Sequence, residues 1–334
     1  MITPSYSMTA TERVLPKLAL DFTTASLDPR VTFTRSGNTA TVINSSGVIT
    51  AINADLPRFD YNPTTLACEG LLIEESRTNL LLNSLIDGTS LGTQVVTVTA
   101  VAHTLSFYGS GTVTLSGVHS ATVNGSGAYP TRTTYTFTPT AGALTLTVSG
   151  TVQFANLEAG AFATSFIPTD ATTKTRNIDV AKLTGSNFTS WFNATQGTLY
   201  AEGTVVNNIV GTNSRIFACL VNAGGTEIFS LEARSSTSTR ARSLTGGATV
   251  LASDAFSALG VERELAGSYI AGEIAMSVEA RTPITAVSNV PSPDQMVIGT
   301  GYNTAAANYA NGRIKRVMYW PQKLTLAELQ ASTK

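Results

Sequence analysis

Short extended segments separated by turn residues run through the whole sequence and restrict its fold more than any other feature. Residues 93–101, 133–138 and 197–206 are typical, with β-branched and aromatic side chains spaced by small polar ones. Such residues favour a pleated, half-buried surface, whereas the intervening Gly, Asn and Ser favour turns. Strands that recur roughly every ten residues are typical of sandwiches and jelly rolls. We therefore predict an all-β fold.

A single short helix is expected at the end of the chain. Thr325 is placed as its N-cap, and Glu328, three residues later, completes a capping box. Leu326 and Leu329 are expected to form its apolar face. No repeat of fixed period is visible, which argues against a propeller, a solenoid and a repeat-built β-helix, while an irregular β-helix stays open.

Length and composition restrict the organisation and the partners of the chain. With 334 residues, it suits two or three modules. Only 13% of the residues are charged and the net charge is −1, so we expect no nucleic-acid partner and a tendency to self-associate. The N-terminus lacks a signal-peptide pattern and no apolar run is long enough to span a bilayer, so we expect no membrane insertion. Cys68 and Cys219 are expected to be free, buried thiols.

The spacing of strands and turns divides the sequence into three regions. Residues 1–85 form an N-terminal β region with extended runs at 17–22, 31–35, 39–44 and 48–51. Residues 86–170 predict a small jelly-roll sandwich, and residues 171–334 predict a larger sandwich, joined to it by a polar link. A module as small as the second buries only a thin core, so it is expected to lean on its neighbours.

Three segments of the first region carry a resemblance to a known family. They read RVTFTRS at 30–36, PRFDY at 57–61 and, most specifically, GLLIEESRTNLL at 70–81. They resemble a widespread group of bacteriophage structural proteins that includes tail fibres, head fibres and spikes. Residues 155–169 resemble the ending of a small carbohydrate-binding-like jelly roll. The segments GTLYAE at 197–202, AGSY at 266–269 and GRIKRVMYWP at 312–321 resemble a laminin-G or concanavalin-A-like lectin sandwich.

The resemblance implies a component of the virion surface that assembles in the host cytoplasm as a homotrimer. Residues 1–85 would anchor it to other virion proteins of the capsid, tail or baseplate. The two sandwiches would project outward and adhere to host-surface glycan through weak sites present in many copies. A purely structural capsid-decorating or baseplate protein without a ligand is the alternative, and a polysaccharide depolymerase spike is the third interpretation.

One loop near the C-terminus has the residue mixture of a sugar site. Tyr302 and Tyr309 offer aromatic platforms, and Asn303, Asn308 and Asn311 offer amides for hydroxyl groups. The alternative is that the tyrosines pack on the sandwich edge and the asparagines form turns. We predict a weak ligand site at these five residues.

Side chains suited to catalysis are scarce, and we expect no enzyme. A Ser-His-Asp triad needs a positioned histidine, and His103 and His119 both fall in strand-like runs as ordinary polar residues. No dense acidic loop, Cys/His cluster or phosphate-binding loop is visible in the sequence, so no metal and no cofactor are expected.

Paired carboxylates are the remaining catalytic candidates, because glycosidases use two of them across a groove. Glu262 and Glu264 are two residues apart and share one face of a predicted strand. Weaker pairs are Glu74 with Glu75 and Glu227 with Glu232. If a depolymerase were present, Glu264 would be the residue to test.

Overall fold

Strands dominate the fold, as the sequence predicts. The computed structural model describes residues 15–206, 214–235, 238–257, 259–301 and 308–334. Apart from a 3-10 turn η1 (Phe22–Thr24), the described residues contain two short helices, α1 (Ser186–Thr189) and α2 (Leu326–Ala331). The all-β prediction is therefore confirmed.

A large sandwich of two sheets holds the main hydrophobic core. Its first sheet contains β1 (Leu18–Asp21), β5 (Phe59–Tyr61), β6 (Cys68–Ile73), β17 (Gln196–Thr204), β22 (Glu262–Ile270), β23 (Glu273–Val278), β24 (Ile284–Ala286) and β26 (Gly312–Trp320). Its second sheet contains β2 (Thr32–Thr34), β16 (Val180–Thr184), β18 (Arg215–Val221), β19 (Ile228–Ser235), β20 (Ser238–Thr245), β21 (Ala248–Asp254) and β25 (Gln295–Ile298). Apolar side chains from both sheets interleave between them.

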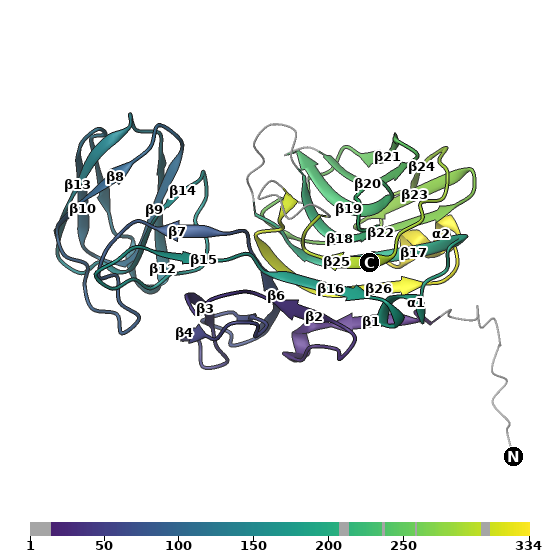
Figure 1. The fold of residues 1–334 in the computed structure, drawn as a ribbon, viewed down its shortest axis with the longest axis horizontal. Helices are drawn as coiled ribbons and strands as arrows, with labels where there is room; N and C mark the ends of the chain where they lie inside the picture. The colour runs from purple at the N-terminus through teal and green to yellow at the C-terminus, as the bar shows by residue number, and fades with distance from the viewer. Residues whose placement is uncertain (1–14, 207–213, 236–237, 258, 302–307) are drawn as a thin grey trace, which may run out of the picture.

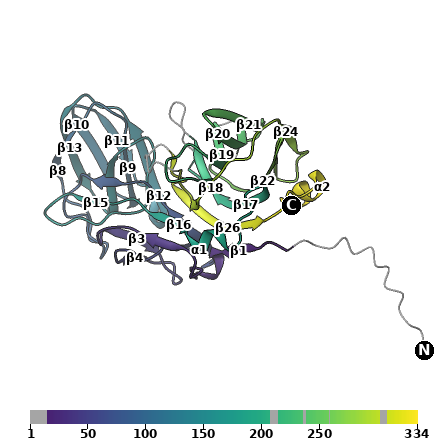
Figure 2. The same ribbon diagram turned by 45° about the vertical axis from the view of Figure 1, so that its right-hand side comes forward.

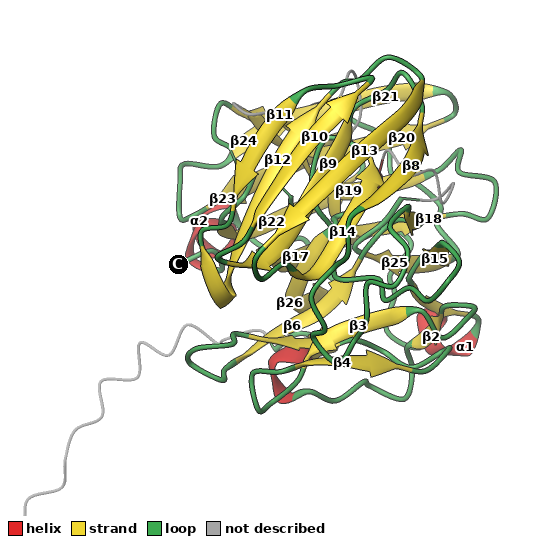
Figure 3. Cartoon of the chain, turned by 90° about the vertical axis from the view of Figure 1, so that its left-hand side faces the viewer, coloured by secondary structure: helices red, strands yellow, loops and turns green. Residues whose placement is uncertain are grey.

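A small sandwich lies beside the large one and has its own core (Figure 1). One sheet contains β8 (Gln94–Val98), β10 (Thr112–Gly117), β11 (Ala121–Asn124) and β13 (Gly142–Ser149). The facing sheet contains β9 (His103–Gly109), β12 (Gly127–Phe137) and β14 (Gln153–Ala159). Figure 3 shows these strands in front, with the hairpin of β3 (Ala40–Ile43) and β4 (Ile49–Ile52) beneath them.

Strands from the N-terminal region belong to both sheets of the large sandwich. β1 and β6 pair with β26, near the other end of the chain, and β2 pairs with β16. Figure 2 shows this N-terminal segment running beneath both sandwiches. The small sandwich is inserted in sequence between strands of the large one, and the pair β7 (Arg77–Asn79) and β15 (Lys174–Arg176) connects the two.

A buried ion network joins these parts, formed by Arg35, Arg58, Glu74, Arg176 and Asp179. Arg58 reaches both carboxylates, with Nη1 2.7 Å from Glu74 and Nη2 bonded to Asp179. Arg176 lies 3.1 Å from Glu74, and Arg35 lies 3.3 Å from Asp179. All three arginine side chains are fully buried, so each depends on these partners.

The contacts of residues 70–81 give a structural reason for the distinctive sequence of this segment. It supplies Glu74 to the ion network and Asn79 to the small sandwich. The Asn79 amide donates to Ala155 O and Ile167 O, both at 2.9 Å. Its oxygen accepts from the backbone N–H groups of Leu81 and Leu157. The expected structural role of this motif thus has a physical basis in the junction.

Three smaller expectations need correction. His119 lies in the loop between β10 and β11 rather than in a strand, because the chain must turn there. Leu326 is 41% exposed, since the inner face of the short helix is formed by Leu329. Both cysteines are free, but only Cys219 is buried, and Cys68 is half-buried at the start of β6.

Candidate functional site

Alternation along strands β19 and β20 places a set of polar side chains on the outer face of the second sheet. Phe229, Leu231 and Ala233 point into the core of the large sandwich. Successive side chains of a strand point to opposite faces, so the residues between them point outward. In β19 these are Ser230, Glu232 and Arg234, and in β20 they are Arg240 and Arg242.

The strand register aligns these side chains in rows across the sheet. Cys219 lies opposite Ser230, which lies opposite Arg242. In the next row, Ile216 lies opposite Glu232, which lies opposite Arg240. Residues directly opposite on neighbouring strands contact one another. Each row therefore runs from an apolar side chain on β18 to an arginine on β20.

The outer face is hollowed into a cavity of about 290 Å³, which we call the arginine groove. Its lining includes Ile216, Cys219, Ile228, Glu232, Arg240 and Arg242. Ser214, Ser230, Arg234, Thr249 and Asn308 complete the lining, and Thr249 among them is exposed. An apolar strip next to a few polar groups is the usual make-up of a ligand site.

Glu232 and Arg240 form the fixed part of this site. Arg240 Nη2 lies 3.0 Å from the Glu232 carboxylate and 3.2 Å from Ser214 Oγ. The Ser230 hydroxyl donates to Glu232 at 2.9 Å. Arg240 Nε is buried without a hydrogen-bond partner among the described residues. These bonds hold both side chains in place before any ligand arrives.

Arg242 differs from Arg240, because it forms no hydrogen bond or ion pair with the described residues. It is half-buried, in the same row of the sheet as Cys219, with Ser230 between them. Burial raises the pKa of the Cys219 thiol, with Glu232 adding to the rise and Arg242 opposing it. The thiol therefore stays neutral and acts as part of the apolar strip.

The groove is cationic, although the chain as a whole is not. Its lining contains three arginines and one glutamate, a formal charge of +2, whereas the net charge of the chain is −1. The sequence signal for this site is the pair of alternating runs, SLEAR at 230–234 and RAR at 240–242. These two runs indicate a site only when β19 and β20 are known to be neighbours, with Ser230 opposite Arg242 and Glu232 opposite Arg240.

The predicted loop site is divided by the structure. Tyr302 and Asn303 lie outside the described residues. Asn308 lines the arginine groove. Tyr309 is fully buried in the core of the large sandwich, so its ring offers no platform to solvent. Asn311 exchanges two hydrogen bonds with Glu75, at 2.8 and 2.9 Å, which fix the segment to the junction.

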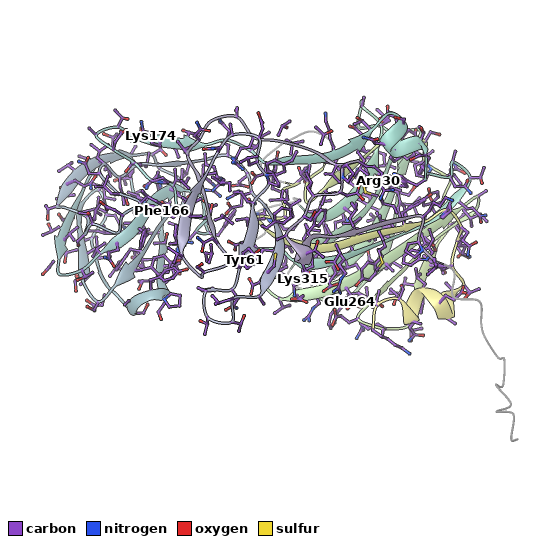
Figure 4. All side chains as sticks on the ribbon, turned by 90° about the horizontal axis from the view of Figure 1, so that it is seen from below. Arg30, Tyr61, Phe166, Lys174, Glu264 and Lys315 are labelled. Atoms are coloured by element: carbon purple, nitrogen blue, oxygen red, sulfur yellow. The ribbon has the colours of Figure 1, made fainter. Side chains whose placement is uncertain are left out.

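Glu262 and Glu264, the first candidate pair of catalytic acids, lie on the other sheet, whereas Glu232 of a weaker pair lines the arginine groove. Glu264 on β22 lies opposite Glu202 on β17, and Glu262 pairs with Lys315 at 2.5 Å. Figure 4 shows Glu264 and Lys315 on the large sandwich, away from Phe166 in the small one. Burial, then the nearby Glu202 and Glu279, raise the pKa of Glu264. Neither Glu262 nor Glu264 lines the arginine groove.

The two histidines have separate surroundings in the small sandwich. His103 is buried, with Nδ1 2.8 Å from Val101 O. His119 stacks on Phe137 with ring centroids 4.5 Å apart, and its Nε2 lies 3.0 Å from the Tyr135 hydroxyl. Both therefore have packing and hydrogen-bonding roles.

A second cavity, of about 310 Å³, lies at the junction of the sandwiches. It is lined by the β3–β4 hairpin, by Tyr108 and Arg132 of the small sandwich, and by Arg313 of β26. Its acids are already paired, since Asp60 contacts Arg313 at 2.5 Å. Arg132 donates to Ser106 Oγ at 2.7 Å. We regard this cavity as secondary to the groove.

In the part of the chain that the structure describes, no cluster of three or more His, Cys, Asp or Glu side chains is suited to a metal ion. No helix in the same residues is long and apolar enough to cross a membrane.

Comparisons with known proteins give partial likenesses. No protein-family model and no curated protein matches the chain. One likeness is to the carbohydrate-binding module CBM40 of the Ruminococcus gnavus IT-sialidase, solved with α2,6-sialyllactose, with 14% sequence identity and a TM-score of 0.35. The alignment covers 44% of this chain and 88% of the CBM40 chain. The NanB sialidase of Streptococcus pneumoniae is 14% identical over 45% of this chain and 26% of its own, with a TM-score of 0.36.

A third likeness extends over more of the chain. The heptameric SAP-like pentraxin of Limulus polyphemus is 10% identical, covers 77% of this chain and 81% of its own, with a TM-score of 0.33. TM-scores of 0.33–0.36 indicate nothing about the ligand of this chain. The β-sandwich architecture rests on the strands described above, and a role on a virion stays a prediction.

Proposed function

We propose that the chain is a surface adhesion subunit of a bacteriophage virion, and that its large sandwich binds glycan in the arginine groove. The observation that carries the binding proposal is the groove itself. It places guanidinium groups and hydroxyls above a floor of buried apolar side chains on an outer sheet face. Sugars present this combination, with C–H faces on one side and hydroxyl groups around the ring.

The virion role is supported by the resemblance of residues 30–36, 57–61 and 70–81 to phage fibres and spikes. A shallow site of this size gives weak binding, which becomes useful when several copies act together. A homotrimer fits that requirement. No hydrolytic step is part of the proposal, because the described residues that line the groove contain a single carboxylate, Glu232, and that group is engaged by Arg240.

A glycan array tests the binding proposal. Thr249 is exposed at the rim of the groove, so Thr249→Trp would fill the groove without touching a charge. Thr285, exposed on β24 of the other sheet, gives the matched control Thr285→Trp. We expect the unaltered protein and the control to retain the same glycans, and Thr249→Trp to lose them. Equal binding by all three proteins would contradict a site in the groove.

Light scattering after size exclusion tests the assembly proposal. A mass of three chains would support the fibre or spike role. A single-chain mass would overturn trimerisation of the chain by itself and favour a decorating protein that is arranged by its place on the particle. A failure of glycan binding combined with a stable trimer would favour the purely structural alternative.

A further inference from the structure

Arg242 is a cationic side chain that the fold itself does not neutralise. It lies half-buried in the arginine groove and has no hydrogen bond or ion pair with the described residues. The buried arginines Arg35, Arg58 and Arg176 all have carboxylate partners in the ion network. Partial burial of a charge costs free energy when the charge has no partner. Arg242 is therefore suited to bind an anionic group of a ligand.

Glu232, the one acid among the described lining residues, does not serve as that partner. Glu232 accepts from Ser230 Oγ and Arg240 Nη2 at 2.9 and 3.0 Å. In the register of the sheet it lies opposite Arg240, whereas Arg242 lies opposite Ser230. The negative charge is therefore one row away and already engaged.

The surroundings of Arg242 restrict the chemistry of the external partner. On β19, Ser230 lies directly opposite Arg242 and separates it from the buried Cys219 of β18. On β21, Leu251 lies opposite Arg242 and is 41% exposed, so it suits an apolar ring face, and the exposed Thr249 lies two residues away on the same strand. A planar guanidinium matches a carboxylate with two parallel hydrogen bonds.

We infer that the ligand of the arginine groove is a sugar that carries a carboxylate, a uronic or nonulosonic acid residue, and that Arg242 is its anion contact. This inference rests on the proposed glycan binding at the same site. The carboxylate pairs with Arg242, the ring packs against the exposed side chain of Leu251, and the ring hydroxyls face Thr249 at the rim of the groove.

The test compares acidic oligosaccharides with the same oligosaccharides after reduction of the carboxyl group to an alcohol. Both sets are printed on one array, together with neutral glycans, and the hits are titrated in solution. The proteins are the unaltered chain, Arg242→Gln, Arg242→Lys and the control Arg30→Gln, whose arginine lies in the N-terminal region next to Asp28. Thermal unfolding confirms that each variant is folded.

We expect carboxyl reduction and Arg242→Gln each to weaken binding by roughly tenfold to a hundredfold, the range of one charge-assisted hydrogen-bonded contact. Arg242→Lys should be intermediate because it keeps the charge without the planar fork. Arg30→Gln should bind like the unaltered chain. Weaker binding at high salt should accompany these effects.

Two results would overturn the inference in different ways. Binding of neutral or carboxyl-reduced glycans that Arg242→Gln leaves unchanged would reject the carboxylate while the proposed glycan binding stands. Retention of sulfated sugars alone would also reject the carboxylate. Absence of binding to every printed glycan would reject the inference and the proposed binding function together.

Discussion

Glu74 shows how a single side chain stabilises the junction of this protein. Its carboxylate contacts Arg58 at 2.7 Å and Arg176 at 3.1 Å, and it accepts two hydrogen bonds from Ser165. Glu74→Gln removes the charge and leaves two buried arginines short of a partner. We expect a loss of about 3–5 kcal/mol in the free energy of unfolding, measured by denaturant titration. The control Glu273→Gln, which removes a surface pair with Lys323, should cost less than about 1 kcal/mol.

The pH dependence of Glu74 provides a second check on the same network. Burial alone would raise the pKa of Glu74, but Arg176 and Arg58 hold this pKa well below its ordinary value of 4.5. The unfolded chain then takes up the proton first, so the stabilisation is complete above about pH 5 and is lost as the pH falls. The difference in unfolding free energy between the unaltered chain and Glu74→Gln should shrink below about pH 4. A constant difference would contradict this account.

Glu264 is expected to behave in the opposite way. It lies opposite Glu202, and burial together with Glu202 and Glu279 raises its pKa above 4.5. The folded state therefore holds the proton more tightly, and the unfavourable contribution grows as the pH rises through the raised pKa. Glu264→Gln should increase stability at pH 7 by up to about 1 kcal/mol, with no gain below about pH 4.

Thermal unfolding at both pH values measures this effect, with Glu262→Gln as the control. Glu262 pairs with Lys315, so its substitution should bring no gain. A loss of stability in Glu264→Gln would refute the repulsion between the two acids. Loss of a polysaccharide-cleaving activity in the same variant would instead support the depolymerase interpretation.

Individual strands and helices follow closely from local sequence. The extended runs expected at 31–35, 39–44 and 48–51 correspond to β2, β3 and β4 within one or two residues. The capping box of Thr325 and Glu328 is present in α2, with both reciprocal hydrogen bonds. These features depend on neighbours in the chain, which is why the sequence predicts them.

The pairing of strands depends on distant residues and was not predictable in the same way. Nothing in the sequence near Leu18 indicates that it lies opposite Tyr319. The arginine groove has the same origin, because Arg242, Ser230 and Cys219 lie in one row only through the register of β18, β19 and β20. The loop site was predicted from composition alone, which does not reveal that Tyr309 turns into the core.

Gly267 on β22 allows the two sheets of the large sandwich to approach each other. A Cβ atom there would lie 2.8 Å from Leu231, 3.1 Å from Phe229 and 3.2 Å from Ala241, all closer than ordinary contacts. Gly267→Ala should therefore destabilise the protein by about 1–3 kcal/mol through overpacking. Gly92→Ala is the matched control, since open space surrounds that position and the substitution should be neutral or slightly stabilising. Equal unfolding midpoints for the two variants would contradict this tight contact.

At the scale of the whole molecule, the N-terminal region and the large sandwich form one unit of secondary structure. The division at residue 85 follows the change in sequence character, yet β1, β2, β5 and β6 lie in the sheets of the large sandwich. The ion network adds side-chain contacts to this pairing, because Arg35 and Arg58 contact Asp179. If residues 1–85 anchor the chain to a virion, the strands that they contribute would therefore attach the large sandwich, and its groove, directly to the anchor.

A fragment of residues 171–334 tests this coupling. It lacks β2, one of the two strands that pair with β16, and it lacks β1 and β6, the N-terminal partners of β26. It also leaves Arg176 and Asp179 without their buried counter-charges. We expect this fragment to lose its cooperative thermal unfolding, followed by circular dichroism, because each broken buried pair costs about 3–5 kcal/mol against a total stability of about 5–15 kcal/mol.

Deleting residues 89–152 provides the control for that fragment. The ends of the deletion are close, since Gln153 Nε2 donates to Gly88 O at 2.5 Å, and all strands of the large sandwich remain. This variant should keep a cooperative transition, because the strands and the ion network of the large sandwich stay intact. If residues 171–334 alone unfold cooperatively at the temperature of the full chain, the N-terminal strands are dispensable, and the groove belongs to an independent domain.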